Sequence, residues 1–351
     1  PPLSSATAGR LIPHPPGYRW RRSRRTRRRA RRGGTMKIGY FLSSEEYTPA
    51  QLLEQARAAE RAGFQALWIS DHYHPWTDAQ GQSPFVWSVI GALSQVSSLP
   101  VSTAVTCPTV RIHPAVLAQA AATSAVMHSG RFVLGVGTGE ALNEHILGDA
   151  WPQTDVRLEM LEEAVAVMRE LWRGDFVNHH GRHYTVEHAR VYTLPDTPPP
   201  VYVSGFGPKA VDLAARIGDG YVSMMPDGDL VSRFRDNGGG DKPCQAGFKA
   251  AYADTEDEGA RIAYETWPNA GVPGELSQVL PSPRHFEQAA QLVTPEQVRQ
   301  GFVCGDSADA HLEMIDRYAK AGFDEVYVAN TGPHWQGLFD LYQREVLPHL
   351  R

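Results

Sequence analysis

Four side chains that could take part in catalysis lie close together in the segment Asp71-His72-Tyr73-His74-Pro75-Trp76. A histidine titrates near neutral pH and can give or take a proton, while a nearby carboxylate stabilises the charge that this transfer creates. The segment directly follows residues 66–69, an apolar run typical of a buried parallel strand. In α/β folds catalytic side chains follow the carboxyl ends of such strands, so the segment is a candidate active-site loop. The competing interpretation is a helix-capping Asp71 followed by aromatic packing.

Alternating strands and helices are expected to position this loop. The predicted strands cover residues 37–42, 66–70, 100–106, 131–137, 200–204, 220–223, 246–252 and 325–329. Helical patterns separate them, among them residues 49–62, 86–96, 114–127 and 156–172. Eight strands interleaved with helices predict an α/β fold, a closed (β/α)8 TIM barrel, rather than a doubly wound sheet. The glycine fingerprint of a dinucleotide-binding sheet is also missing after the first strand, where residues 43–46 read Ser-Ser-Glu-Glu.

The sequence predicts one barrel domain, residues 36–351, with insertions at its C-terminal rim. Residues 176–192 are polar and aromatic, with His-Gly and Pro-rich turns, which predicts a hairpin. Residues 267–300 are rich in Pro, Gly and Gln. This composition predicts a lid-like insertion near the barrel mouth, helical in part, that helps to close over a substrate.

Residues 1–35 differ from the rest in composition, because they hold eleven of the 34 Lys and Arg residues and no Asp or Glu. Such a segment could be a nucleic-acid-binding arm or a twin-arginine export signal. Neither is favoured, since no apolar segment follows the arginines and residue 37 already begins the first predicted strand. We interpret residues 1–35 as a disordered or non-native extension, with Met36 as the natural start.

The rest of the chain carries 23 basic and 39 acidic residues, a formal charge near −16, which argues against a nucleic-acid partner. It has no run of about 18 apolar residues, so a membrane span is not expected. The three cysteines, Cys107, Cys244 and Cys304, form an odd number without metal-ligand spacing. This usage favours a reduced, cytoplasmic protein without a metal site.

Three further polar motifs follow predicted strands, which places them on the same barrel rim as Asp71 and His72. They are Thr106-Cys107-Pro108-Thr109, Gly137-Thr138-Gly139-Glu140 and Ser204-Gly205-Phe206-Gly207. Glycines let the backbone approach a ligand closely, and the third motif opens a helix whose free N–H groups suit a phosphate. Ordinary turns need glycine as well, but the joint placement of these motifs favours a ligand site.

Together these motifs resemble the bacterial-luciferase-like superfamily of flavin and deazaflavin barrels, over nearly all of residues 37–351. The similarity is strongest to the subgroup typified by glucose-6-phosphate dehydrogenases that use coenzyme F420, an 8-hydroxy-5-deazaflavin. It implies an oxidoreductase that transfers a hydride between an alcohol or carbonyl substrate and C5 of F420, and it implies a homodimer. The similarity rests on Ser70-Asp71-His72 with Pro75-Trp76, Thr106-Cys107-Pro108-Thr109, Gly135-Val136-Gly137-Thr138-Gly139-Glu140-Ala141-Leu142-Asn143-Glu144 and Ile217-Gly218-Asp219-Gly220.

The resemblance implies roles for three catalytic residues. His72 would exchange the proton of the substrate hydroxyl, and Glu140 would protonate or stabilise the ring nitrogen of the cofactor. Trp76 would wall the pocket and stabilise a protonated His72 through its ring face, unless it only packs on the rim. His74 departs from the family segment, and its two interpretations are a second proton relay and, favoured here, a loop histidine that faces solvent.

Further positions are implied to contact the cofactor. A non-proline cis peptide bond is typical of the family where this chain has Ala104-Val105. The cofactor-contacting positions, with the last four at the phosphate-bearing tail, are Asp71, Ala104, Val105, Cys107, Thr138, Gly139, Asn143, Phe206, Gly207, Lys209 and Ala210.

The predicted substrate pocket departs from the subgroup. Its sugar-phosphate enzymes bind phosphate with a threonine and a lysine after strand six, where this chain has Met224 and Asp227. A phosphate dianion would meet a carboxylate there instead of a cation, so glucose 6-phosphate is not the expected substrate. Met224 and Met225 suit an alcohol, a ketone or a larger secondary metabolite. The alternatives are a monooxygenase that uses flavin mononucleotide (FMN), which is less favoured as cofactor, and a non-catalytic cofactor-binding barrel.

Overall fold

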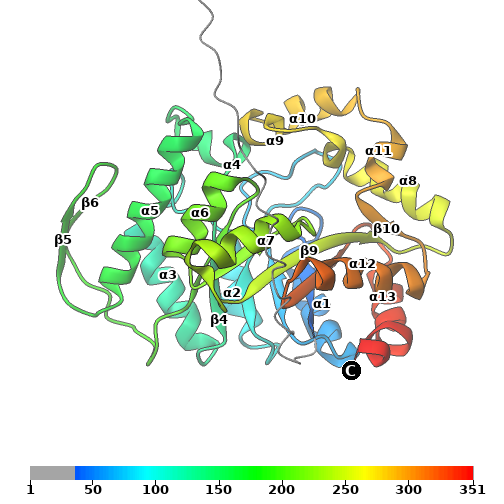
Figure 1. Ribbon diagram of the computed structural model, residues 1–351, viewed down its shortest axis with the longest axis horizontal. Helices are drawn as coiled ribbons and strands as arrows, with labels where there is room; N and C mark the ends of the chain where they lie inside the picture. The colour runs from blue at the N-terminus through cyan, green and yellow to red at the C-terminus, as the bar shows by residue number, and fades with distance from the viewer. Residues whose placement is uncertain (1–35, 351) are drawn as a thin grey trace, which may run out of the picture. The chain divides into compact units, whose positions relative to one another are not determined.

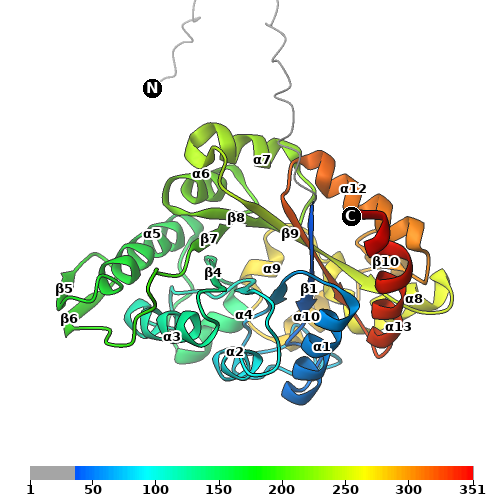
Figure 2. The ribbon, with the colours of Figure 1, turned by 90° about the horizontal axis from the view of Figure 1, so that it is seen from below.

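Eight parallel strands form a closed barrel that is surrounded by helices (Figures 1 and 2). The computed structural model describes residues 36–350, so the predictions made for residues 1–35 lie outside the described part. Barrel strands pair with their neighbours in chain order, and the last pairs with the first to close the ring, which confirms the predicted (β/α)8 fold. The strands are β1 (Lys37–Leu42), β2 (Leu67–Ile69), β3 (Val101–Thr103), β4 (Phe132–Val136), β7 (Val201–Ser204), β8 (Gly220–Ser223), β9 (Cys244–Ala251) and β11 (Glu325–Asn330).

The outer helices start and stop at residues with suitable capping chemistry. α1 (Pro49–Ala62) begins after Thr48, which forms a reciprocal capping box with Gln51, and it ends at Gly63 in the left-handed conformation (φ +98°). Within residues 36–350, no helix is long and apolar enough to cross a bilayer. The other outer helices are α2 (Val86–Leu93), α3 (Pro114–Met127), α5 (Thr154–Leu171), α6 (Pro208–Ile217), α7 (Gly228–Phe234) with η2 (Arg235–Gly239), α8 (Glu256–Thr266), α12 (Ala308–Ala321), α13 (Trp335–Leu341), η4 (Tyr342–Val346) and η5 (Leu347–Leu350).

A ninth strand, β10 (Phe302–Cys304), joins the sheet and is missing from the sequence prediction. It pairs with the second half of β9, from Lys249 to Ala251, whereas β8 pairs with the first half, from Cys244 to Ala246. The strands β2 and β3 are equally short, but each lies within a longer apolar or β-rich run, whereas β10 directly follows the Pro-, Gly- and Gln-rich segment 267–300. β9 therefore has two successive partners on the same edge.

Aromatic side chains fill the barrel interior. The rings of Trp68 and Tyr327 stack with centroids 4.3 Å apart, and Nε1 of Trp68 donates to Oε1 of Gln245 at 3.0 Å. Gly39 on β1 leaves room for them, because a Cβ there would lie 2.3 Å from the Tyr327 ring. The filled interior leaves the rim as the place for a ligand.

Two segments stand outside the regular strand and helix alternation. β5 (Val177–His180) and β6 (Thr185–Ala189) pair in antiparallel fashion next to α5 (Figure 1). The segment between α8 and β10 packs around Trp267, Val293 and Val298. Its α9 contacts α4 (Ala141–Glu144), which follows β4, so the segment lies at the carboxyl ends of the strands. Its helices are η3 (Pro268–Gly271), α9 (Leu276–Val279), α10 (Pro283–Ala290) and α11 (Pro295–Arg299).

A buried histidine makes the stability of this fold dependent on pH. His311 on α12 is fully buried, and its Nδ1 lies 3.0 Å from the Tyr342 hydroxyl. Burial lowers its pKa to about 4, so the folded state holds the ring neutral while the unfolded chain protonates it near pH 6.5. This contribution to stability is complete above pH 6.5, is lost progressively as the pH falls from about 6.5 to about 4, and changes little below that.

We expect His311→Leu to remove this dependence. Between neutral pH and pH 4 the free energy of unfolding of the unmodified protein should fall by about 3 kcal/mol more than that of the variant. Urea unfolding across this pH range measures the difference. His180→Leu on exposed β5 is the control and should behave like the unmodified protein. Parallel pH profiles for His311→Leu and the unmodified protein would contradict the assignment.

Candidate active site

Asp71 follows β2 and is held by two groups from the segment after β3. Its buried carboxylate accepts hydrogen bonds from the Thr106 hydroxyl (2.8 Å) and from Nη2 of Arg111 (2.8 Å). Nε of Arg111 also lies 3.5 Å from Oε1 of Glu144 on α4. One guanidinium thus contacts two buried carboxyl groups. The helix that follows is capped by Phe85, so the interpretation of Asp71 as a helix cap is wrong.

His72 faces a carboxylate from the loop after β1. Its Nε2 lies 3.4 Å from Oε1 of Glu45, and Oε2 of Glu45 accepts a hydrogen bond from the Ser70 hydroxyl (2.7 Å). Burial raises the pKa of Glu45, but the charges of a protonated His72 and of Lys249, with the Ser70 hydrogen bond, outweigh it and bring the pKa below its ordinary value. The pair places a titratable ring beside a carboxylate that favours its ionised form.

Trp76 lies between His72 and the segment after α8. The ring centroids of His72 and Trp76 are 5.2 Å apart at an interplanar angle of 55°. Phe286 of α10 meets Trp76 edge to face, with centroids 5.1 Å apart. Trp76 therefore walls the side of the site that the segment 267–300 covers.

The turn after β4 brings Glu140 to the same rim. Gly139 adopts a φ of +82°, and a Cβ there would lie 2.9 Å from the Glu144 side chain, so this turn requires glycine. Glu140 is the residue before α4 and is partly buried. Its neighbour Thr138 is also partly buried.

Asn143 connects these groups. Its Oδ1 accepts from the backbone N–H groups of Tyr73 (2.9 Å) and His74 (3.2 Å). Its Nδ2 lies 3.0 Å from Nδ1 of His72 and 3.5 Å from Oε2 of Glu140. The Asn143 side chain is buried. It links the loop after β2 to α4, and it does so beside His72 and Glu140, the two residues predicted to transfer protons.

His74 is partly buried rather than exposed. Its Nδ1 lies 2.9 Å from the carbonyl oxygen of Leu142, and its ring stacks on His145 with centroids 6.2 Å apart. The expectation that His74 faces solvent is therefore wrong. The loop folds back on α4, a tertiary contact that the sequence pattern does not report.

Two further groups beneath the rim have raised pKa values. Burial raises the pKa of Glu144 to about 7, although backbone N–H groups of Arg111 and Val110 and the Arg111 charge favour the carboxylate. Burial, with the nearby Glu144 and Glu140, raises the pKa of the Cys107 thiol well above its ordinary value. Cys107 is thus an apolar wall residue rather than a nucleophile.

An apolar wall runs along the end of β3. The peptide bond between Ala104 and Val105 is cis, as the family resemblance implied. Both side chains are partly exposed and pack with Met224 against the aromatic interior. A Cβ at Gly137 would lie 2.8 Å from Cγ2 of Val105, so the backbone after β4 approaches this wall closely.

The predicted positions of the phosphate-bearing tail lie at the start of α6. Gly207 precedes the helix, and a Cβ there would meet nothing within 4 Å, so the N-terminus is open. Phe206 is 54% exposed. Lys209 is exposed and its Nζ lies 2.7 Å from Oδ1 of Asp155, while the side chain of Ala210 closes the turn beside Gly205.

The two predicted substrate-pocket residues lie in different surroundings. Met224 packs against the cluster of aromatic side chains inside the barrel. Asp227 is exposed, and its Oδ1 accepts from the N–H groups of Asp229 (2.9 Å) and Leu230 (3.0 Å), which caps α7. Asp227 thus has a capping role that is sufficient to explain its presence.

Sequence reasoning missed a charged cluster opposite His72. Nζ of Lys249 on β9 lies 3.2 Å from the Trp267 ring centroid, and burial lowers its pKa although Glu45 and Glu46 oppose this effect. Glu46 accepts from the Thr331 hydroxyl and from the N–H of Gly332, both at 2.9 Å. Two adjacent glutamates directly after β1 could have indicated Glu45 and Glu46 as site residues. The sequence around Lys249 has no comparable feature.

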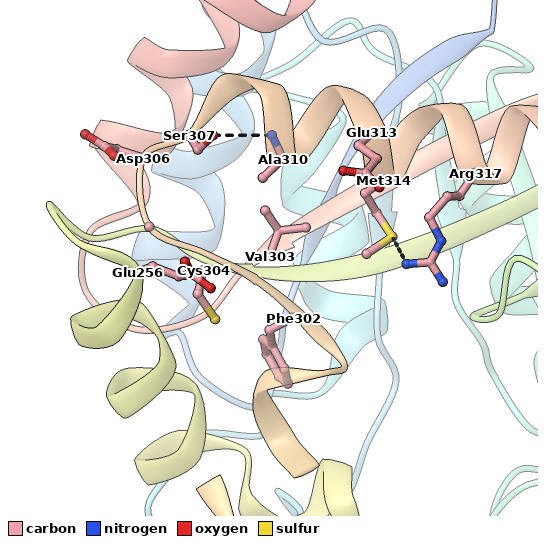
Figure 3. Close-up of a pocket in the computed structure, with 11 residues that line it drawn as sticks. Glu256, Phe302, Val303, Cys304, Asp306, Ser307, Ala310, Glu313, Met314 and Arg317 are labelled. Atoms are coloured by element: carbon pink, nitrogen blue, oxygen red, sulfur yellow. Dashed lines mark hydrogen bonds between the residues drawn. The ribbon is translucent and has the colours of Figure 1, made fainter. Parts of the chain in front are cut away.

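A separate pocket of about 330 Å³ lies between β10, α12 and the start of α8, where Glu256, Cys304 and Arg317 are among the lining residues (Figure 3). It contains none of the residues predicted for the active site. Among residues 36–350, no group of His, Cys, Asp and Glu side chains is arranged to hold a metal ion.

The chain is similar to known proteins over most of its length. A model of the family described as luciferase-like monooxygenase matches residues 36–325. The F420-dependent glucose-6-phosphate dehydrogenases of Microbacterium testaceum and Nakamurella multipartita are 33% and 34% identical, over 90% of this chain and 98% and 97% of theirs.

Solved structures agree with this similarity. An F420-dependent secondary alcohol dehydrogenase, in complex with an F420-acetone adduct, is 32% identical with a TM-score of 0.84, covering 91% of this chain and all of that one. The coenzyme F420-dependent tetrahydromethanopterin reductase of Methanopyrus kandleri, at 20% identity and a TM-score of 0.72 over 91% of this chain and all of its own, shares the fold. The matched residues and these identities show that the chain belongs to the bacterial-luciferase-like family of barrels.

Proposed function

We propose that this protein is an F420-dependent oxidoreductase that transfers a hydride between an alcohol or carbonyl substrate and C5 of the deazaflavin. The observation that carries the proposal is the junction at Asn143, where His72 and Glu140 approach the same amide nitrogen. Relatives named as F420-dependent dehydrogenases, at 32% to 34% identity over about nine-tenths of the chain, support the cofactor.

The rim fits a long, flat cofactor with a phosphate tail. The apolar wall of Ala104, Val105 and Met224 suits one face of a tricyclic ring, and Asp71, Thr138, Gly139 and Cys107 lie along the adjoining turns. The open N-terminus of α6 at Gly207 presents free N–H groups, which suit the phosphate. When bound, the deazaflavin supplies a two-electron hydride acceptor or donor and does not activate oxygen.

The residues of the chain then divide the proton chemistry between two sites. His72 and Glu45 face each other at 3.4 Å and handle the proton of the substrate oxygen. Glu140, on the other side of Asn143, handles the proton of the cofactor ring. Trp76 packs beside His72 and is backed by Phe286, an apolar wall that would exclude water from the reacting atoms.

A secondary alcohol or ketone is the proposed substrate class. Met224 gives the pocket an apolar wall. By the family resemblance, Asp227 occupies the position at which the sugar-phosphate enzymes have a lysine, so a cation is missing there. The charge of Lys249 is opposed by Glu45 and Glu46, so it does not replace the missing phosphate clamp. The acetone adduct of the similar alcohol dehydrogenase supports this class.

We further infer that the protein acts as a cytoplasmic homodimer. Its three cysteines are free and buried, as is usual in a reducing compartment. Apolar side chains are exposed on neighbouring helices, at Phe85 before α2 and at Val116, Val126 and Met127 on α3. A self-complementary contact would remove this apolar surface from water.

The proposed function is tested by cofactor binding and turnover. We expect tight binding of F420, weaker binding of FMN, and a change in deazaflavin absorbance with secondary alcohols or, for reduced F420, with ketones. Glucose 6-phosphate should give no turnover, because Met224 and Asp227 stand where the sugar-phosphate enzymes have phosphate-binding residues. Oxygen-dependent turnover with reduced FMN would instead identify a monooxygenase, and cofactor binding without any turnover would identify a non-catalytic barrel.

The proton-transfer roles predict specific kinetic losses. His72→Ala and Glu140→Gln should each lower kcat by roughly 10²- to 10⁴-fold, the range of general acid–base catalysis, while F420 binding measured by titration persists. His180→Ala on the remote hairpin strand β5 is the control for His72→Ala. Unchanged kcat in both active-site variants would show that neither group transfers a proton.

The dimer is tested by light scattering. We expect a mass twice that of the chain, and Val126→Asp should shift the protein towards the monomer because it buries a carboxylate at the contact. Leu292→Asp, at an exposed position of the segment before β10, should leave the mass unchanged. A monomeric unmodified protein would refute the proposed contact.

A further inference from the structure

The amide of Asn143 has only one orientation that satisfies its neighbours. Its oxygen accepts two backbone N–H groups, from Tyr73 at 2.9 Å and from His74 at 3.2 Å. If the amide were rotated by half a turn, its NH2 group would face these two donors, and the buried N–H groups would lose their acceptor. The nitrogen of Asn143 must therefore point to His72 and Glu140.

This orientation determines which nitrogen of His72 carries hydrogen. Nδ1 of His72 lies 3.0 Å from Nδ2 of Asn143, which is a donor, so Nδ1 must supply the lone pair. In the neutral ring the hydrogen is then on Nε2, which faces Oε1 of Glu45. The other tautomer would place two donors against each other, and its one gain, a hydrogen bond from Nδ1 to the His74 carbonyl, is longer at 3.3 Å.

We propose that Asn143 is a positioning residue that holds neutral His72 as the Nε2–H tautomer, so that His72 offers the substrate oxygen a proton donor instead of a lone pair. The proposal rests on the proposed function and refines the role of His72 within it. His72 then acts as a neutral electrophile through its N–H group, and Glu45 is the group that takes up or returns the proton.

The reaction balances with these roles. In the direction of oxidation, the O–H bond of the alcohol breaks and its proton passes to the carboxylate of Glu45. The C–H bond breaks and its electron pair leaves as a hydride, for which a bound deazaflavin would be the acceptor, while the carbon–oxygen bond becomes C=O. Nε2–H of His72 donates a hydrogen bond to the oxygen throughout and is unchanged at the end. The 3.4 Å between Nε2 and Oε1 of Glu45 exceeds a normal N–H···O bond, so neither group is committed to the other, and the proposal places the substrate oxygen beside this pair.

The proposal differs from a direct cofactor contact by Asn143. Both acceptor sites of the amide oxygen and both hydrogens of the amide nitrogen have partners within the chain. A hydrogen bond to the cofactor would require one of these four contacts to break. A positioning role therefore predicts a loss in kcat, whereas a cofactor contact predicts a loss in affinity.

Asn143→Asp separates the two roles. The aspartate keeps an oxygen for the N–H groups of Tyr73 and His74 but presents an acceptor instead of a donor to Nδ1 of His72. We expect the ring to change to the Nδ1–H tautomer. Two-bond ¹H–¹⁵N NMR correlations of the cofactor-free protein, labelled with ¹⁵N-histidine, identify the protonated nitrogen, and the His72 signals are those lost in His72→Gln.

The NMR result decides the proposal without cofactor or substrate, so its failure is distinct from failure of the proposed function. An Nε2–H signal in the unmodified protein and an Nδ1–H signal in Asn143→Asp support it. Nδ1–H in the unmodified protein, or no change in the variant, would overturn it. If Asn143→Asp does not fold, Asn143→Ala removes the donor alone, and Nδ1–H should appear because the His74 carbonyl then becomes the best partner of Nδ1.

Kinetics supply the second readout. With saturating F420, kcat of Asn143→Asp should fall by about 10²-fold or more, while the dissociation constant of F420 stays within about threefold. Loss of affinity with an unchanged kcat would show that Asn143 contacts the cofactor only. Asn178→Asp is the matched control, because its Oδ1 accepts the N–H of His188 (2.7 Å) on the remote hairpin, and it should change neither quantity.

Discussion

The guanidinium of Arg111 lies between the buried carboxylates of Asp71 and Glu144, and the arrangement of the rim depends on this contact. It joins the segments that follow β2, β3 and β4, where backbone pairing beyond the strands is reduced to a bridge between Thr106 and Val136 and a few single hydrogen bonds. Breaking a buried ion pair typically costs about 3–5 kcal/mol, because the remaining charge is left without a partner. Removing the cation here would leave Asp71 without its ionic partner and would further disfavour the ionised form of Glu144, whose pKa burial already raises to about 7. The loop that carries His72 and the helix that carries Asn143 are therefore held by the same residue.

The barrel was accessible from the sequence because its signals are local and repeated. Each of the eight closing strands is an apolar run bounded by turn residues, and α1 has its capping box, its first-turn proline and its terminal glycine in sequence order. β10 was not accessible. Its three residues pair with Lys249 to Ala251, some fifty positions earlier in the chain, and only the tertiary structure reveals such a partner.

The active-site residues also separate into those with a local sequence signal and those that only tertiary contacts reveal. His72, Trp76 and Glu140 lie in short motifs with unusual composition, so their grouping on one rim followed from the ends of the strands. Lys249 stands alone in an ordinary strand, and its approach to Trp267 depends on how α8 ends, so no pattern announced it. The position of His74 against Leu142 and the capping role of Asp227 likewise depend on how a loop turns back, which residue type alone does not fix.

The two partners of β9 have a consequence for how the site can change. The chain leaves the sheet after Ala251, passes through α8 and the helices 268–299, and returns as β10 beside the strand it left. Both ends of this segment are anchored to β9. Closing a longer loop between fixed ends costs little free energy, about 0.6 kcal/mol for each doubling of the loop length. The segment that supplies Phe286 can thus be lengthened, shortened or replaced without opening the barrel. The wall of the active site can therefore be exchanged in this architecture, while the residues proposed to transfer protons stay on loops that directly follow barrel strands.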